Sequence, residues 1–234
     1  MSAIYKRDLR AFFTSPVGYV FIAAFVFVMN LVFYIMNMLT SQNRLTSCYG
    51  IMFYALVVLA PVLTMRTFSE DYKQRTDQLL LTAPVKPVGI VMGKFLAAYT
   101  VFVISLLLLL VQVIIISAVS TPNGAIIFGN YIALLSVGAV FIAIGCFVSS
   151  LTENQLVANI ATLAINVFLF LMDYAYSLIQ LTWIKRILYW ISIFRRYNTF
   201  YVGVFSVADF FFYICAAAVF LFLTVRVLEK KRWS

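Results

Sequence analysis

Six long apolar runs dominate this sequence of 234 residues and limit what it can fold into. They cover residues 17–39, 49–65, 88–119, 128–148, 156–173 and 210–225. Each is close to, or longer than, the roughly 20 residues that a helix needs to cross a hydrocarbon core. The runs are continuous and do not alternate as barrel strands do, so helices are the way to satisfy their backbone groups in lipid. The sequence therefore predicts an all-α membrane protein, residues 1–234, with six transmembrane helices in one domain.

The basic residues predict how these spans are oriented. If the N-terminus is inside, twelve of the 17 Lys and Arg residues fall on the cytoplasmic side and five on the outer side. The cytoplasmic set is Lys6, Arg7, Arg10, Arg66, Lys73, Arg75, Lys86, Lys94, Arg226, Lys230, Lys231 and Arg232. The outer set is Arg44, Lys185, Arg186, Arg195 and Arg196. Because cytoplasmic loops of membrane proteins carry the excess of Lys and Arg, both termini are expected in the cytoplasm. The net charge of +9 then serves as an anchor against anionic membrane lipid, and no nucleic-acid partner is expected.

The residues needed for catalysis are missing from the sequence. It contains no histidine, which excludes His-based acid–base chemistry and HExxH zinc sites, and it has no GxxxxGK[ST] phosphate loop. The three cysteines are scattered without metal-ligand spacing. The chain is therefore expected to be no enzyme, with no catalytic residue, no metal and no cofactor of its own.

Two flanking segments lie outside the spans. Residues 1–16 have Ile4, Leu9 and Phe12 among basic residues, which fits an interfacial helix and equally an ordinary basic flank. Residues 174–208 are aromatic, but the pairs Lys185-Arg186 and Arg195-Arg196 prevent a clean crossing. We expect this segment to re-enter or lie in the outer leaflet. Capping boxes, in which a side chain bonds a backbone N–H three residues on, are expected at the starts of the last two spans. Their residues are Thr152 with Gln155, and Ser206 with Asp209.

The stretch between the second and third runs, residues 66–87, concentrates charge that the rest of the chain lacks. Only 11% of the chain is charged, yet seven charged residues fall here. They are Arg66, Glu70, Asp71, Lys73, Arg75, Asp77 and Lys86. One interpretation is a short amphipathic helix with Thr67 or Ser69 as cap, Tyr72, Leu79 and Leu80 as its apolar side, and Lys73 paired to Asp77. The other is a solvated loop whose charges keep it out of lipid, and the pattern alone favours neither.

The sequence of this stretch, "RTFSEDYKQRTDQLLLTAPVKP", resembles the cytoplasmic signature that follows the second span in ABC type-2 exporter permeases. Thr76 and residues 79–85 match that signature, while Arg75 stands where the family often has Gly and Gln78 where it often has Glu. Asp77 is the neighbour that could replace the missing acidic group. Three further segments resemble the family in the same order: "KRDLRAFFTSPVGYV", "SLTENQLVA" and "FFFYICAAAVFLFLTVRVLEKKRW". The chain is most similar to the compact branch associated with gliding motility.

The resemblance implies a permease, an exporter in the plasma membrane of a prokaryote, that pairs with a second permease copy or paralogue. It also implies two copies of a separate ABC ATP-binding subunit, which would bind the ATP and Mg²⁺. Residues 66–87 would be the coupling helix that docks into this subunit, through Glu70, Asp71, Lys73, Arg75, Thr76, Asp77, Gln78, Leu79 and Leu80. The first and fifth spans are our expectation for the dimer contact. The alternative is a membrane scaffold that anchors a cytoplasmic or surface assembly without transporting anything.

Overall fold

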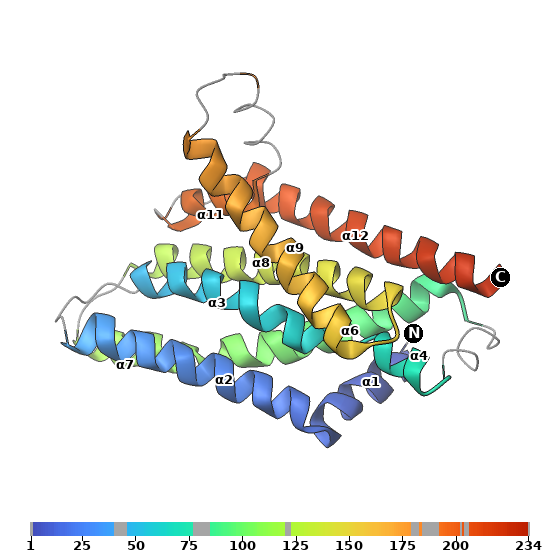
Figure 1. Cartoon of the computed structure of the whole chain (residues 1–234). Coiled ribbons are helices and arrows are strands. Elements are labelled where there is room, and N and C mark those ends of the chain that lie inside the picture. Colours follow the sequence, from blue (N-terminus) through green and yellow to red (C-terminus); the bar gives the residue numbers. More distant parts are fainter. Residues whose placement is uncertain are drawn as a thin grey trace.

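The computed structural model describes residues 2–39, 46–76, 85–119, 123–178, 183, 192–201, 203 and 206–233. Every regular element in these residues is a helix (Figure 1). In chain order they are α1 (Ser2–Thr14), α2 (Pro16–Phe33), the π-helix η1 (Tyr34–Leu39), α3 (Thr46–Thr64), α4 (Ser69–Lys73), α6 (Pro87–Leu108), α7 (Leu110–Val119), α8 (Gly124–Leu151), α9 (Gln155–Leu178), α11 (Ile193–Tyr201) and α12 (Val207–Trp233).

Six helical stretches of the described chain are long and apolar enough to cross a membrane. They are Pro16–Met38, Cys48–Lys73, Pro87–Ala118, Gly124–Leu151, Gln155–Tyr174 and Val207–Arg232. Each overlaps one of the six apolar runs, so the predicted fold class of an all-α, six-span membrane protein is confirmed. Two of the stretches extend well beyond the run that they overlap: Cys48–Lys73 continues past residue 65 through α4, and Val207–Arg232 continues past residue 225 into its basic tail.

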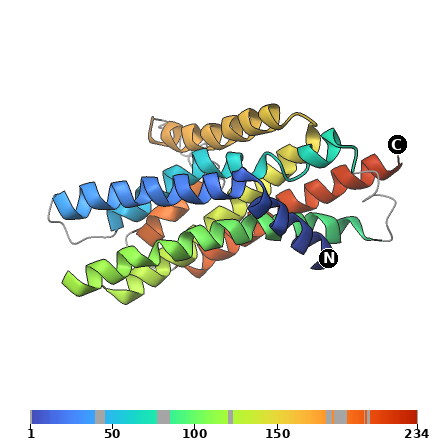
Figure 2. The ribbon, with the colours of Figure 1, turned by 90° about the horizontal axis from the view of Figure 1, so that it is seen from below.

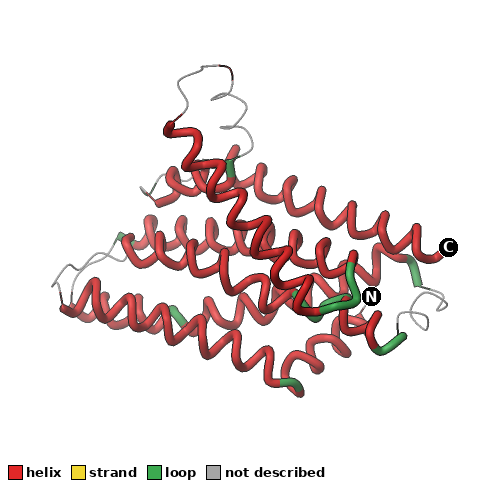
Figure 3. The backbone as a smooth tube through the Cα atoms, in the orientation of Figure 1, coloured by secondary structure: helices red, strands yellow, loops and turns green. Residues whose placement is uncertain are grey.

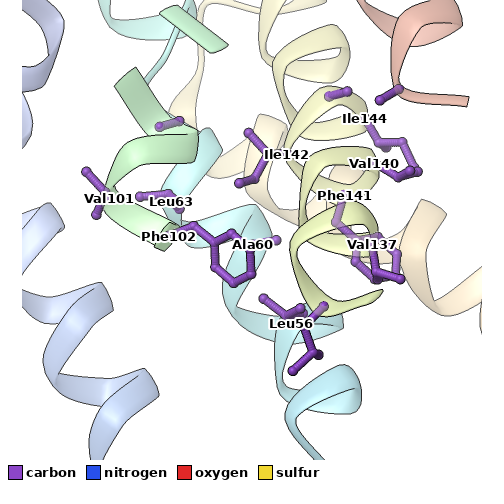
Figure 4. Close-up of a cluster of buried hydrophobic side chains, with 14 of the residues drawn as sticks. Leu56, Ala60, Leu63, Val101, Phe102, Val137, Val140, Phe141, Ile142 and Ile144 are labelled. Carbon is purple, nitrogen blue, oxygen red and sulfur yellow. The ribbon is translucent and has the colours of Figure 1, made fainter. Parts of the chain in front are cut away.

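Helix α8 forms the centre of the bundle. It packs against α3, α6, α9 and α12, and it is the most buried of the six spans. In the buried cluster of Figure 4, Ile142 of α8 lies on the side of α8 that faces Leu63 of α3 and Phe102 of α6. Helix α9 lies across the bundle (Figure 1) and belongs to the least buried of the six spans.

Helix α1 is a separate helix that turns away from the first span. Ser15 is extended at φ −95° and ψ 156°, and Pro16 starts α2 at a position where its missing N–H costs nothing. Figure 2 shows α1 lying at an angle to the bundle and against α6. Its apolar residue Ile4 is buried against Gly93 of α6, and Phe12, also buried, lies beside Gly18 of α2. The predicted helix thus exists, and part of its apolar side faces protein.

The two ends of the bundle differ in what they contain. The basal end holds α1, α4, the turn at residues 152–154 and the C-terminal part of α12, so the described chain starts and finishes at this end (Figure 3). The distal end holds η1, the start of α3, the end of α9 and α11. The third span, α6 and α7 with a one-residue break at Leu109, is long because the first turns of α6 belong to the basal end.

Candidate functional site

The charged stretch forms a short helix with a sharp stop. In α4, the N–H of Thr76 donates to the carbonyl of Asp71 at 2.9 Å, and the N–H of Arg75 donates to the carbonyl of Tyr72 at 3.1 Å. This pair of bonds is a Schellman motif, in which the residue after the C-cap takes a left-handed conformation. Arg75 does so, with φ of 56°. The Thr76 hydroxyl reinforces the turn by donating to Asp71 Oδ1 at 3.0 Å.

The predicted coupling residues are therefore divided by this turn. Glu70, Asp71 and Lys73 lie on α4, and Arg75 and Thr76 lie in the turn that ends it. Helix α4 ends at Lys73. The expected pairing of Lys73 with Asp77 therefore cannot be an i,i+4 pair within this helix. Asp77, Gln78, Leu79 and Leu80 lie outside the described residues.

The start of α4 is capped by another helix. Ser149 Oγ, from the last turn of α8, accepts hydrogen bonds from the backbone N–H of Phe68 at 3.1 Å and of Ser69 at 3.2 Å. Thr67, one of the two expected caps, donates its hydroxyl to the carbonyl of Thr64 at 2.8 Å. The expectation that Thr67 or Ser69 caps α4 is wrong, because the free N–H groups of the helix are turned into the protein, where Ser149 reaches them.

Lys94 of α6 binds two carboxylates at the basal end. Its ammonium lies 2.6 Å from Asp71 Oδ2 and 3.2 Å from Asp8 Oδ2, and it donates to the carbonyl of Thr67 at 2.6 Å. The Lys94 side chain is only 4% exposed and also lies over the ring of Phe68. A buried ammonium is costly unless it is paired and hydrogen-bonded, and here three oxygens from two other segments of the chain satisfy it.

Helix α1 supplies the other half of the cluster. Arg7 lies 2.7 Å from Asp8 Oδ1 and 3.4 Å from Asp71 Oδ2. Partial burial acts to lower the pKa of Arg7, but the neighbouring Asp8 and Asp71 carboxylates outweigh it and raise that pKa. The close approach of α1 depends on Gly93 of α6, where an added Cβ would lie 3.1 Å from Cγ2 of Ile4. An open pocket of about 420 Å³ borders this cluster and exposes part of its polar surface.

Side chains of α4 thus reach α1, α6, α8 and α12 at the basal end. Asp71 links it to α1 and α6, Ser69 bonds Ser149 of α8, and the ring of Tyr72 lies 3.5 Å from the ammonium of Lys231 on α12. A second pocket of about 490 Å³ separates Lys73 from the α8–α9 turn, with Glu153 and Asn154 in its wall. The side chains of α4 and its turn that face solvent are Lys73, Gln74 and Arg75. Asp71 and Glu70 are engaged within the chain, Glu70 with Arg66.

The other predicted caps are partly different in the structure. At the start of α9, Asn154 accepts from the N–H of Leu156 at 2.9 Å, while Thr152 accepts from the N–H of Asn154 at 3.2 Å. The side chain that caps α9 is therefore Asn154, and Gln155 is the first residue of the helix. At the start of α12, Ser206 accepts from the N–H of Asp209 at 3.3 Å as expected. The Asp209 carboxylate itself binds Arg196 of α11 at 2.7 Å.

The distal end is held mainly by aromatic rings. The ring of Phe53 lies 4.5 Å, centroid to centroid, from those of Phe194 and Tyr197 on α11. Arg196 is buried between Asp209 and the ring of Phe212, and Arg195 lies 3.3 Å from Asp173. Of the expected outer-leaflet segment, Lys185 and Arg186 lie outside the described residues. The described part contains α11, whose nine residues are too few to cross a bilayer.

Sequence reasoning missed Lys94 and Ser149, which organise the basal end. Lys94 carried a signal, since it is a single cation at the seventh position of an otherwise apolar run. An intramembrane or near-membrane charge needs a partner, and Asp8 and Asp71 were among the carboxylates on the same expected side. Ser149 carried none, because a serine near a helix end is common.

Comparison with known proteins identifies the family. The family model for "ABC-2 family transporter protein" matches residues 2–233, nearly the whole chain. No curated protein matches the chain significantly.

Proposed function

Because the chain belongs to the ABC-2 family of transporter membrane proteins, we propose that it is the permease of an ATP-driven exporter in a prokaryotic plasma membrane. In this proposal the basal end faces the cytoplasm, where a separate ABC subunit binds ATP and Mg²⁺ and docks against α4. The finer placement, in the compact branch associated with gliding motility, rests on the sequence motifs alone. The family is one of membrane subunits, and the ATPase chemistry belongs to the partner.

The observation that supports coupling through α4 is its set of contacts. A push on α4 reaches α8 through Ser149, α6 through Lys94, α1 through Arg7 and α12 through Lys231. Ion pairs and hydrogen bonds fix distance and direction, so a displaced α4 moves these helices or breaks the bonds. A solvated loop, which was the other interpretation of this stretch, would not make such contacts.

The surface offered to the ATPase is basic in its described part. Lys73 and Arg75 are exposed, whereas Asp71 is occupied inside the chain. The partner groove is therefore expected to present carboxylates to Lys73 and Arg75. Glu153, across the second pocket from Lys73, lies close enough to contribute an acidic point to the same docking surface.

We also propose that two permease copies, or this chain and a paralogue, pair in the membrane. The first and fifth spans have wide apolar faces that no other described element covers. Phe27 on α2 is 68% exposed, and Leu156 and Ile160 on α9 are 68% and 66% exposed. These faces fit either lipid or a second copy, and the family resemblance favours the second copy.

The docking surface is tested by charge reversal. The double variant Lys73→Glu, Arg75→Glu should insert normally but co-purify with the ATP-binding subunit about tenfold less well at low salt, a loss of ~1.4 kcal/mol. The loss should shrink in high salt, since exposed charges are screened. Lys230→Glu, on an exposed position of α12 at the same end, is the matched control and should bind like the parent.

Transmission is tested separately with Ser149→Ala. This variant keeps the docking surface but removes the side-chain acceptor for two N–H groups of α4. The ATP-binding subunit should still bind, while its MgATP hydrolysis should lose its dependence on the permease. If the double variant and Ser149→Ala both bind and couple like the parent, α4 is not the coupling element. A subunit whose hydrolysis never depends on the permease would favour the scaffold alternative.

A further inference from the structure

A groove on the lipid-facing side of the bundle runs between α6 and α12, with α8 as its floor. Its volume is about 570 Å³, which lies in the range of small-molecule sites. The walls are apolar for most of their length, with Val88, Val91 and Phe95 on one side and Leu221 and Phe222 on the other. This groove has no part in the α4 cluster described above.

Small residues keep this groove open. Ala139 of α8 and the consecutive Ala217 and Ala218 of α12 line it where larger side chains would close the gap between the helices. On either side of the two alanines, Ile214 is 46% exposed and Phe222 is 56% exposed, and both flank the opening. The groove therefore has apolar edges and runs along α12.

One end of the groove, its mouth, carries two opposite charges. Arg226 and Glu229 line the groove at the basal end of α12, with Arg226 Nη1 2.9 Å from Glu229 Oε2. Their side chains are 64% and 37% exposed, so both remain accessible from outside the protein. The Arg226 guanidinium also lies 5.0 Å from the centre of the Phe222 ring, which holds it over the mouth. The first basic residues of the C-terminal tail follow at once, which places this mouth at the level of lipid headgroups.

We propose that the groove binds one phospholipid whose headgroup carries both a phosphate and a primary ammonium, as in phosphatidylethanolamine. One acyl chain lies along Ala217 and Ala218, the phosphate contacts Arg226, and the ammonium donates to Glu229. Charge complementarity selects this occupant: a mouth with one cation and one carboxylate matches a zwitterion with an N–H donor. An anionic headgroup without an amine would satisfy Arg226 and leave its negative charge next to Glu229.

The headgroup decides selectivity because the tail cannot. Lipid tails are as apolar as the groove, so moving a tail from bilayer to groove gains packing but no hydrophobic driving force. The surrounding basic residues Lys230 and Arg232 attract anionic lipid in general. A retained aminophospholipid at this groove would therefore stand out against a neighbouring lipid shell that is richer in anionic lipid.

The test is lipid retention by the purified, full-length protein. The protein is exchanged into nanodiscs made of equal parts phosphatidylethanolamine and phosphatidylglycerol, extracted with mild detergent, and its tightly bound lipid is quantified by mass spectrometry. Phosphatidylethanolamine should be enriched about threefold over phosphatidylglycerol, the scale of an exposed ion pair. Glu229→Gln should abolish this preference, and Arg226→Gln should lower retention of both lipids. Arg232→Gln, an exposed cation on the same helix, is the matched control and should leave the preference intact.

The tail contact needs its own variant. Ala218→Phe fills the groove and should remove the retained lipid, whereas Val219→Phe, at a 55% exposed position beside it that does not line the groove, should not. Equal retention of the two lipids by the parent, or equal loss in both phenylalanine variants, would overturn the proposal. A disulfide between two copies carrying Ala218→Cys, on a background without native cysteines, would also overturn it by assigning the groove to a protein interface.

Discussion

The two ends of the bundle are joined by different chemistry. At the basal end one ammonium, that of Lys94, binds Asp8 and Asp71, so α1, α4 and α6 meet at a single buried cation. At the distal end the ring of Phe53 meets rings from α8 and α11. Beside this aromatic cluster, Arg195 pairs with Asp173 and Arg196 with Asp209.

This difference bears on what each end can transmit. Stacked rings gain their energy from short-range contact over a broad area and hold helices together with little directional demand. A shared buried cation adds little net stability, because desolvation offsets the attraction, but losing one member leaves the others unpaired and is costly. The basal end is therefore suited to fix the position of α4, and the distal end to hold the bundle together.

The largest expected effect comes from removing the shared cation. Lys94→Met should destabilise the protein by about 3–5 kcal/mol, because Asp8 and Asp71 would lose their buried ammonium and keep only the half-exposed Arg7 as a cationic partner. Thermal unfolding in detergent micelles measures the change. Lys6→Met, an exposed lysine of α1, is the matched control and should unfold like the parent.

A combined variant separates the charge from the packing. Lys94→Met with Asp8→Asn and Asp71→Asn removes all three charges, and much of the lost stability should return. The combined variant should bind the ATP-binding subunit like the parent, while the dependence of that subunit's hydrolysis on the permease should be lost. Full stability of Lys94→Met alone would show that the basal end is held by apolar contact, as the distal end is.

A smaller effect is expected from weakening the aromatic cluster. Phe53→Leu keeps an apolar side chain but loses the ring contacts with Phe194 and Tyr197, and each aromatic pair contributes about 0.5–1.5 kcal/mol. The expected loss of stability is about 1–3 kcal/mol by the same micelle assay. The dependence of the partner subunit's ATP hydrolysis on the permease should stay unchanged, because no contact at the basal end of the bundle is altered.

The control for this variant is Phe27→Leu, at a position of α2 that is 68% exposed to lipid. It should leave stability nearly unchanged. If Phe53→Leu removed the dependence of ATP hydrolysis on the permease, the contrast between a basal end that positions α4 and a distal end that holds the bundle together would fail.

The spans could be predicted from the sequence because they depend on local composition. Twenty apolar residues in a row have to be helical in a bilayer whatever they pack against. The same holds for the stop before Pro16 and for the cap at Ser206, where neighbouring residues supply both donor and acceptor.

The contacts that hold α4 at the basal end could not be predicted in this way. Phe68 and Ser69 find their acceptor in Ser149, 80 and more residues away, and Asp71 finds Lys94 on the next span. Only the fold brings these groups together. Asp71 was expected to face a partner protein because it lies in a charged stretch. In the structure its carboxylate instead points inward to Lys94, which lies among apolar residues in the sequence. Arg75 is an intermediate case: the family's frequent glycine at this position already pointed to a left-handed residue.

The smallest effect concerns that residue and its counterpart at the distal end. Within the described chain the two residues with clearly positive φ are Arg75, at 56°, and Gly203, at 92°. A left-handed conformation costs a non-glycine residue roughly 1–2 kcal/mol, and glycine gives back part of this through its freer unfolded state. Arg75→Gly should therefore stabilise the α4 turn by about 0.5–1 kcal/mol, and Arg75→Ala should give no such gain. Gly203→Ala should do the opposite, because its Cβ would also lie 2.9 Å from Cγ1 of Ile126.

Hydrogen exchange by mass spectrometry resolves both effects locally. In Arg75→Gly the amide of Thr76, which donates to Asp71, should exchange about two- to fivefold more slowly, the equivalent of ~0.5–1 kcal/mol. In Gly203→Ala the amide of residue 203, which donates to Phe200, should exchange faster. Slower exchange in Arg75→Ala as well would mean that the arginine side chain, and not its backbone angle, strains the turn. Because Arg75 is also part of the proposed docking surface, Arg75→Gly should bind the ATP-binding subunit less tightly even as its turn becomes firmer. That opposite change would separate the two roles of one residue at the basal end.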